Sequence, residues 1–161
     1  MKMKYQYFNH MSVPGDGDCF FHSLATIFSY EITNKKPDNI EKKSFAIRRR
    51  VMRWLENNLD FKLPTGLTIR DEISEAIKDE INIAKEKERK PKYKDINGYF
   101  DYMEKPGSYA GQIEIYGVSN IYKRNVRTYS HIKKKFSNIG LGYIYDDTKN
   151  IDDIYLYLGY S

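Results

Sequence analysis

The sequence predicts a single α+β domain over residues 1–161, with helices flanking a small, mostly antiparallel β-sheet formed largely by the C-terminal quarter. Apolar residues recur at helical spacing through the first three quarters, and runs with strand composition follow in the last quarter. No internal repeat, low-complexity linker or change of composition divides the chain, whose 161 residues suit one hydrophobic core. A series of helices followed by a series of strands is typical of the α+β class.

Two helices are expected after the N-terminal segment. The apolar spacing that follows Cys19 predicts a first helix to about Tyr30. A second helix is expected from about Ile40 up to Asn57 and Asn58, after a loop that closes on an N-cap. Its approximate apolar face consists of Ile40, Phe45, Ile47, Val51, Trp54 and Leu55.

Three further helices are expected before the strands. Thr68 can cap a third helix, which Pro91 ends. Its apolar face consists of Ile69, Ile73, Ile77 and Ile81. Residues 95–103 predict a short helix and residues 109–122 another. The last contains two glycines, and a glycine inside a helix costs about 1 kcal/mol relative to alanine. They therefore indicate close packing against another backbone.

Three strands are expected in the last quarter. Asn125–Tyr129, Gly142–Tyr145 and Ile154–Leu158 are rich in β-branched and aromatic residues. The polar run Asp146–Asn150 predicts the turn between the last two.

Charge and cysteine content restrict the class of protein. The net charge is +5, with 27 basic and 22 acidic side chains mostly interleaved, so the basic runs Arg48–Arg50 and Lys133–Lys135 are interpreted as solvated surface. The apolar runs are too short to span a bilayer, and the N-terminal residues lack the apolar core of a signal peptide. One cysteine excludes an intrachain disulfide. We expect an intracellular, cytoplasmic protein without membrane or nucleic-acid partners.

The single cysteine follows a turn rich in glycine and acid. Gly15, Asp16, Gly17 and Asp18 lead into Cys19 at the first turn of the expected helix. A helix N-terminus carries partial positive charge and N–H groups without intrahelical acceptors, so a thiol there ionises more easily. The same amides can bind an oxyanion. The pattern favours a nucleophile over the alternative, a small buried apolar residue.

Two other interpretations of the turn are weaker. A phosphate cradle is disfavoured because Asp16 and Asp18 would repel the anion and no Lys-Ser/Thr follows. A calcium loop needs further oxygen ligands and a glutamate at its twelfth position. We therefore expect neither a metal nor a cofactor.

Three segments together resemble the OTU (ovarian tumour) cysteine proteases, most of which are deubiquitinases. Residues 15–23 resemble the family's Asp-Gly-x-Cys box around the nucleophile. Residues 106–115 and then 126–129 are similar to its Trp-Gly-x-x-x-Glu helix and the following strand, with Tyr109 near the usual tryptophan. Residues 154–159 look like the strand that leads to the catalytic histidine.

The resemblance implies a papain-like OTU fold and a thiol-dependent ubiquitin hydrolase. Cys19 would attack the bond after the C-terminal glycine of ubiquitin or a ubiquitin-like modifier and form a thioester. Amides of Cys19 and of Asp16 or its neighbours would stabilise the oxyanion. Gly15, Gly17 and Asp18 would form the active-site turn, because glycines let the backbone bend and approach the substrate. Ubiquitin and ubiquitinated proteins would be the partners.

The family pattern continues from its last strand into a His-Tyr-Asp or His-Tyr-Asn sequence. The printed sequence ends at residues 159–161, so we expect the segment with the general base to be absent from it. Three histidines are present, His10, His22 and His131. His22 lies three residues after Cys19, where we interpret it as a helix-face or core histidine with a satisfied ring rather than a base.

Two alternatives follow from this departure and from the charge. One is a catalytically inactive OTU-like module that binds ubiquitin or serves a structural role. The other, from a different class, is a basic nucleic-acid-associated module, for which strongly salt-dependent binding is expected. The richness in Lys, Asn, Ile and Tyr suggests an AT-rich genome, such as that of a virus or an intracellular bacterium acting in host cytoplasm.

Overall fold

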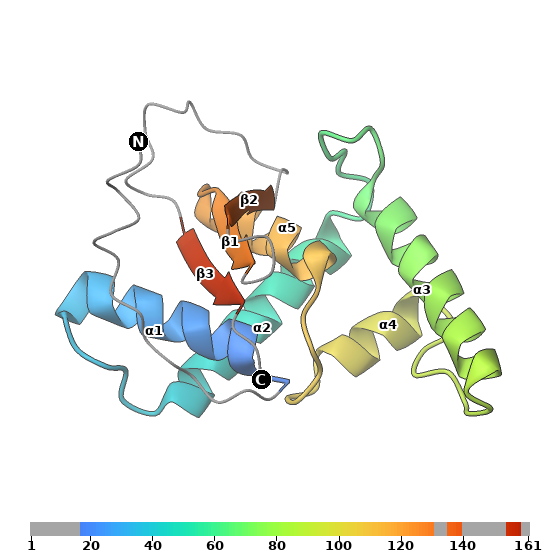
Figure 1. The fold of residues 1–161 in the computed structure, drawn as a ribbon, viewed down its shortest axis with the longest axis horizontal. Coiled ribbons are helices and arrows are strands. Elements are labelled where there is room, and N and C mark those ends of the chain that lie inside the picture. The colour runs from blue at the N-terminus through green and yellow to red at the C-terminus, as the bar shows by residue number, and fades with distance from the viewer. Residues whose placement is uncertain (1–16, 131–134, 140–153, 159–161) are drawn as a thin grey trace.

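The computed structural model describes residues 17–130, 135–139 and 154–158 (Figure 1). The helices are α1 (Cys19–Thr33), α2 (Ile40–Asn57), α3 (Ile69–Glu86), α4 (Ile96–Met103) and α5 (Gln112–Tyr122), and the strands are β1 (Val126–Ser130), β2 (Lys135–Ile139) and β3 (Ile154–Leu158). The five expected helices are confirmed, although α1 continues past Tyr30 and α5 begins after Tyr109. None of the described helices is long and apolar enough to cross a membrane.

Local capping fixes where the middle helices begin. The Thr68 hydroxyl accepts a hydrogen bond from Asp71 N–H at 3.1 Å, and the Asp71 carboxylate accepts one from Thr68 N–H at 2.9 Å. This capping box pairs two backbone donors that have no intrahelical acceptor, and it confirms Thr68 as the cap of α3. Asp95 caps α4 by accepting from Gly98 N–H at 2.6 Å.

The core is built around α2, which packs against α1 and α5. Val51 and Leu55 of α2 are completely buried and face Gly117 of α5. A Cβ at Gly117 would lie 3.0 Å from Val51 Cγ1, closer than ordinary van der Waals contact. The expected close packing is present at Gly117, but its neighbours are the side chains of Val51 and Leu55 rather than another backbone. The other glycine, Gly111, instead precedes α5 as its N-cap.

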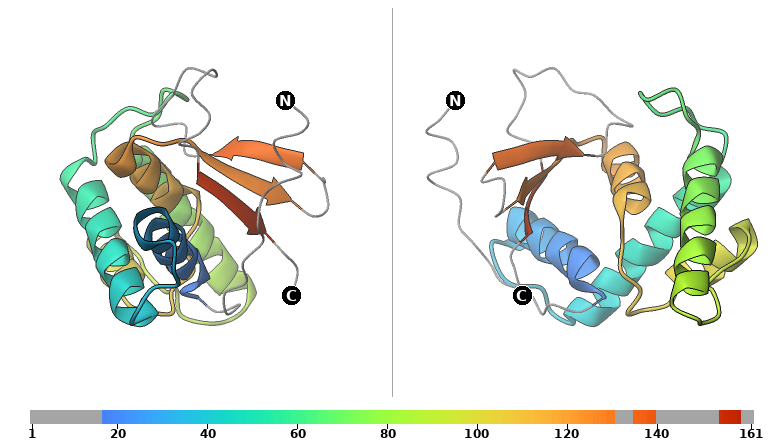
Figure 2. Two further views of the ribbon diagram at one scale, coloured as in Figure 1. Left: turned by 90° about the vertical axis from the view of Figure 1, so that its left-hand side faces the viewer. Right: turned by 45° about the vertical axis from the view of Figure 1, so that its right-hand side comes forward.

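The strands form one sheet in the order β2-β1-β3. β1 pairs antiparallel with β2 and parallel with β3, and Val126 of β1 lies opposite both Ile139 and Ile154. Val126 and Ile154 are completely buried and join the sheet to the core. Figures 1 and 2 show the sheet beside α1 and α5, away from α3 and α4.

This arrangement corrects the expected sheet. Helices dominate the described residues, and one of the two strand pairings is parallel, so a mostly antiparallel sheet is wrong. The strand β2 (Lys135–Ile139) was not expected, because its sequence alternates polar and apolar residues only weakly. The expected strand Gly142–Tyr145 lies outside the described residues.

A partly buried ion pair holds the segment that follows α3. The Glu80 carboxylate, only 8% exposed, accepts from both terminal nitrogens of Arg89 at 2.6 and 3.1 Å. It also accepts from Lys92 N–H at 2.7 Å. The hydrogen bonds from Arg89 outweigh the effect of burial and lower the pKa of Glu80 to about 2. The carboxylate therefore ties the connection between α3 and α4 back onto α3.

Replacing Glu80 by glutamine should lower the free energy of unfolding by about 2 kcal/mol at pH 7, because Arg89 loses its paired charge. The folded-state pKa is lowered from 4.5 to about 2, so the wild-type contribution is present above pH 4.5 and is lost as pH falls through about 2. Denaturant unfolding of both proteins between pH 2 and 7 measures the difference, which should shrink towards the acid end. The control is Glu75→Gln, whose exposed carboxylate lies 3.5 Å from Lys78 and should contribute less than about 0.5 kcal/mol. A pH-independent difference would contradict the assignment.

Candidate active site

Cys19 is the first residue of α1 and is partly exposed. Asp18 precedes it as the N-cap, and its carbonyl oxygen accepts from His22 N–H at 2.9 Å, which begins the helical hydrogen bonding. The Asp18 side chain makes no capping bond to α1, and the first turn contains no acidic residue. The thiol therefore lies where the helix dipole favours its ionised form.

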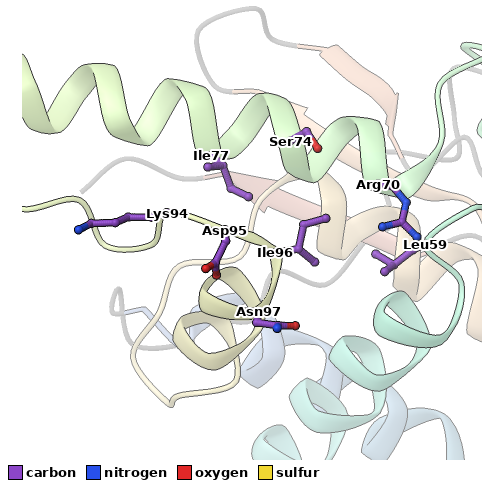
Figure 3. A pocket seen from close by; sticks show the side chains of 8 residues that line it. All are labelled: Leu59, Arg70, Ser74, Ile77, Lys94, Asp95, Ile96 and Asn97. Atoms are coloured by element: carbon purple, nitrogen blue, oxygen red, sulfur yellow. The ribbon is translucent and has the colours of Figure 1, made fainter.

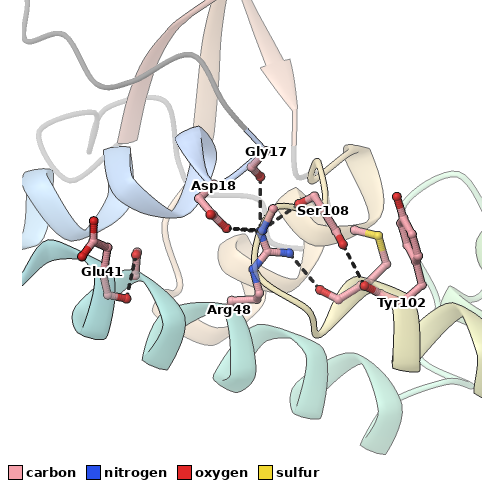
Figure 4. Close-up of polar contacts among 9 residues, drawn as sticks. Gly17, Asp18, Glu41, Arg48, Tyr102 and Ser108 are labelled. Atoms are coloured by element: carbon pink, nitrogen blue, oxygen red, sulfur yellow. Dashed lines mark hydrogen bonds and ion pairs between the residues drawn. The ribbon is translucent and has the colours of Figure 1, made fainter.

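The residues before Cys19 are held by Arg48, which is 1% exposed and comes from the middle of α2 (Figure 4). One terminal nitrogen donates to the Gly17 carbonyl at 3.2 Å, to Asp18 Oδ1 at 2.8 Å and to the Ser108 carbonyl at 2.8 Å. The other donates to the Met103 carbonyl at 2.8 Å. A single guanidinium thus joins the cysteine turn to residues 103–108, at the end of α4 and in the connecting segment that leads to α5.

Asp18 makes a second connection between these segments. Its Oδ1 atom accepts from Gly107 N–H at 2.8 Å as well as from Arg48. Burial acts to raise the pKa of Asp18, but the hydrogen bonds from Gly107 and Arg48 prevail and lower it. Asp18 is therefore a carboxylate at neutral pH, with its charge directed towards Arg48.

Gly17 touches the same connecting segment through its backbone. A Cβ built on Gly17 would overlap the carbonyl oxygen of Gly107. The structure thus gives a reason for glycine that differs from the expected one. Residue 17 must lack a side chain so that the turn can pack against Gly107. This packing alone explains the glycine, without any approach of the backbone to a substrate.

The start of α5 is fixed by a buried acid. Glu114 is 1% exposed, and its carboxylate accepts from Gly111 N–H at 2.7 Å and from the Tyr99 hydroxyl at 2.6 Å. Burial raises the pKa of Glu114 despite these two bonds. Tyr109, before α5, is 67% exposed. Glu114 therefore sets the end of the connecting segment, while Tyr109 extends towards solvent.

The other predicted site residues divide into two groups. Gly15, Asp16, His10 and His131 lie outside the described residues. His22 is 6% exposed on α1, as expected of a core histidine. Its ring is not satisfied, however, because Nδ1 is buried without a hydrogen-bond partner among the described residues.

Sequence reasoning missed Arg48, which it assigned to a solvated basic run. The signal that identifies it is helical spacing. Arg48 lies four residues after Ser44 and three before Val51, both buried on the inner face of α2. Gly107 and Ser108 lie in the segment 106–115 that carries the resemblance, but the contacts of Gly107 with Asp18 and of Ser108 with Arg48 depend on tertiary structure.

Two grooves among the described residues lie away from the cysteine turn. One of about 590 Å³ between α3 and α4 is lined by Leu59, Arg70, Ser74, Ile77, Lys94, Asp95, Ile96 and Asn97 (Figure 3). Another of about 520 Å³ is lined by Phe45, Arg49, Asp101, Glu104, Lys105 and Pro106. Neither includes the cysteine turn. Within residues 17–130, 135–139 and 154–158, no group of three His, Cys, Asp or Glu side chains could hold a metal ion.

Comparison with known proteins agrees with the cysteine turn and its surroundings. A family model described as OTU-like cysteine protease matches residues 14–158, which include the turn, α5 and the three strands of the described residues. No curated protein matches the chain. The family match covers far more than half of the sequence, including both segments joined by Arg48. The chain therefore belongs to the OTU-like cysteine protease family.

Proposed function

We propose that this protein is a thiol-dependent deubiquitinase in which Cys19 is the nucleophile. Membership in the family supports a cysteine protease of this general type. The observation that carries the assignment is the position of Cys19. It is the first residue of α1, on a turn held to residues 103–108 by Arg48 and Asp18. A partly exposed thiol at a fixed helix N-terminus has the setting of an activated nucleophile.

The proposed reaction passes through a thioester. The Cys19 thiolate attacks the carbonyl carbon after the C-terminal glycine of ubiquitin, and the oxyanion formed is stabilised by backbone N–H groups at the turn. The carbon–nitrogen bond then breaks, and the amine leaves with a proton from the general acid. Water hydrolyses the thioester and regenerates the thiol. In the OTU pattern the histidine that exchanges these protons follows the strand that β3 resembles, so we do not give His22 this role.

Labelling by a ubiquitin with an electrophilic C-terminus tests this proposal. The complete gene product should form a covalent adduct that mass spectrometry maps to Cys19, and it should release ubiquitin from isopeptide-linked chains. Ubiquitin without the electrophile is the control and should give no adduct. An adduct on another residue would contradict Cys19 as nucleophile.

The same experiment separates the alternatives. If the protein binds ubiquitin but is neither labelled by the electrophile nor active in hydrolysis, the proposal of an enzyme fails and an inactive ubiquitin-binding module is favoured. Absence of ubiquitin binding together with RNA or DNA binding that weakens steeply with salt would favour the nucleic-acid module. Ubiquitin and ubiquitinated proteins as partners, one domain over residues 1–161 and an intracellular location are part of the proposal.

A further inference from the structure

We infer that Arg48 is a positioning residue for the nucleophile, acting through Asp18 and the Gly17 carbonyl. The inference rests on the proposed function, since it assigns a role in the Cys19 reaction. It goes beyond that function because Arg48 belongs to none of the segments that identify the nucleophile. Arg48 lies in the middle of α2, 31 residues after Gly17 and 60 before Ser108.

The first step is the geometry of the guanidinium. Its two terminal nitrogens donate to four oxygen atoms, two before Cys19, one on the last residue of α4 and one in the segment after α4. A planar fork can hold partners in fixed directions, whereas the ammonium of lysine is a compact charge on a flexible stem. The side chain is also packed beneath Phe21, whose ring centre lies 4.5 Å from the guanidinium carbon. Arg48 therefore fixes where both segments lie relative to α2.

The second step is the orientation of one peptide group. Arg48 draws the Gly17 carbonyl towards the buried side of the turn. In a trans peptide the following N–H points away from the carbonyl, so this bond also fixes the direction of Asp18 N–H. Stabilising an oxyanion depends on such backbone directions being set before the reaction. Arg48 thus holds the Gly17–Asp18 peptide, which precedes the peptide that carries Cys19 N–H, in one of its two flip states.

The third step is the role of Asp18. Its Oδ1 atom accepts one hydrogen bond from the Arg48 guanidinium and one from Gly107 N–H, both at 2.8 Å. One oxygen therefore links α2, the cysteine turn and the connecting segment. These two bonds require an acceptor oxygen at this place, and the amide oxygen of asparagine supplies one. Removing the oxygen releases Gly107 and leaves the charge of Arg48 without its carboxylate. Both hydrogen bonds should therefore persist when Asp18 is replaced by asparagine, and both should be lost when it is replaced by alanine.

Steady-state hydrolysis by variants of the complete gene product tests the inference. Asp18→Ala should lower kcat about 30-fold with KM within about two-fold of wild type, because positioning acts on the reaction rather than on binding. Asp18→Asn should recover kcat to within about three-fold. Arg48→Lys should lower kcat about 100-fold. Arg53→Lys on the exposed side of α2 is the matched control and should leave both constants unchanged.

Each variant is assayed well below its own melting temperature, so that loss of fold does not enter the comparison. Wild-type kcat in folded Asp18→Ala and Arg48→Lys would overturn the inference, as would an Asp18→Asn protein as impaired as Asp18→Ala.

A second readout is the rate of Cys19 alkylation by iodoacetamide, which needs no ubiquitin. If the wild-type protein does not act on ubiquitin, the proposed function fails. Arg48 then keeps its role only if alkylation differs at least about five-fold in Asp18→Ala and Arg48→Lys but not in Asp18→Asn.

Discussion

A Cys19→Ala variant is expected to lose hydrolysis of ubiquitin substrates by on the order of 10⁴-fold or more, because no other group can form the thioester. The variant should remain folded. Cys19 is partly exposed at the N-terminal end of α1, so loss of its sulfur leaves no enclosed cavity in the core. Ubiquitin binding should stay within about two-fold of wild type. The loss would then lie in the chemical step.

Release of a fluorophore from the C-terminus of ubiquitin measures the rate, and isothermal titration measures binding. Cys19→Ser is the matched variant, because it keeps the size of the side chain and replaces the thiol by a hydroxyl that does not ionise near neutral pH. It should be nearly as inactive as Cys19→Ala. If Cys19→Ala hydrolyses ubiquitin at more than about one tenth of the wild-type rate, another residue is the nucleophile.

The helices could be predicted because their signals are local. Thr68 and Asp71 form their capping box within one turn, so sequence alone is enough to place the start of α3. The isoleucine spacing that follows gives its buried face correctly for Ile69, Ile73 and Ile77. The C-terminal end of α1 was harder, since Asn34 ends it in a left-handed conformation that also suits an ordinary loop.

The sheet could be predicted less well because its pairing is not local. Strand composition identified β1 and β3, but composition does not say which strands are neighbours or in which direction they run. Val126 and Ile154 are both buried and lie opposite each other, and the register from this pair to Ser130 and Leu158 runs in the same direction along β1 and β3. Antiparallel pairing was the simpler expectation for strands joined by short turns.

In the candidate site, the cysteine turn could be predicted and the residue that holds it could not. Gly17, Asp18 and Cys19 form a recognisable pattern, whereas Arg48 was hidden among three consecutive arginines. An arginine is rarely buried unless it is paired, and its partners here are distant in sequence. The helical spacing that gives Val51 and Leu55 as core residues also places Arg48 on their face of α2. The run of three arginines is interpreted as solvated surface from its charge, although the helical spacing places Arg48 on the buried face.

Replacing Gly17 by alanine is expected to lower both stability and activity. The added methyl group would overlap the Gly107 carbonyl oxygen, which belongs to backbone and cannot turn aside as a flexible side chain would. Gly107 is itself held by its N–H bond to Asp18, so relief of the overlap requires that bond or the Arg48 bonds to lengthen. We expect a loss of about 3 kcal/mol in the free energy of unfolding, the upper range for overpacking. Hydrolysis should fall at least about 100-fold, since the peptide before Cys19 shifts with the turn.

Alanine variants of two other glycines serve as controls. They separate the steric overlap expected in Gly17→Ala from the other effects of adding a methyl group. A Cβ at Gly111 meets only Glu114 Oε1, at 3.8 Å, so Gly111→Ala should cost less than about 1 kcal/mol, the effect of alanine at an N-cap. Gly107 has open space around its Cβ position but a φ of +90°, so Gly107→Ala tests backbone strain without overlap and should cost about 1–2 kcal/mol. Denaturant unfolding and ubiquitin hydrolysis of the three variants should therefore rank Gly17→Ala as the most impaired. If Gly17→Ala equals Gly111→Ala in both measurements, the turn does not pack against Gly107 as described, and the connection that would position Cys19 is lost with it.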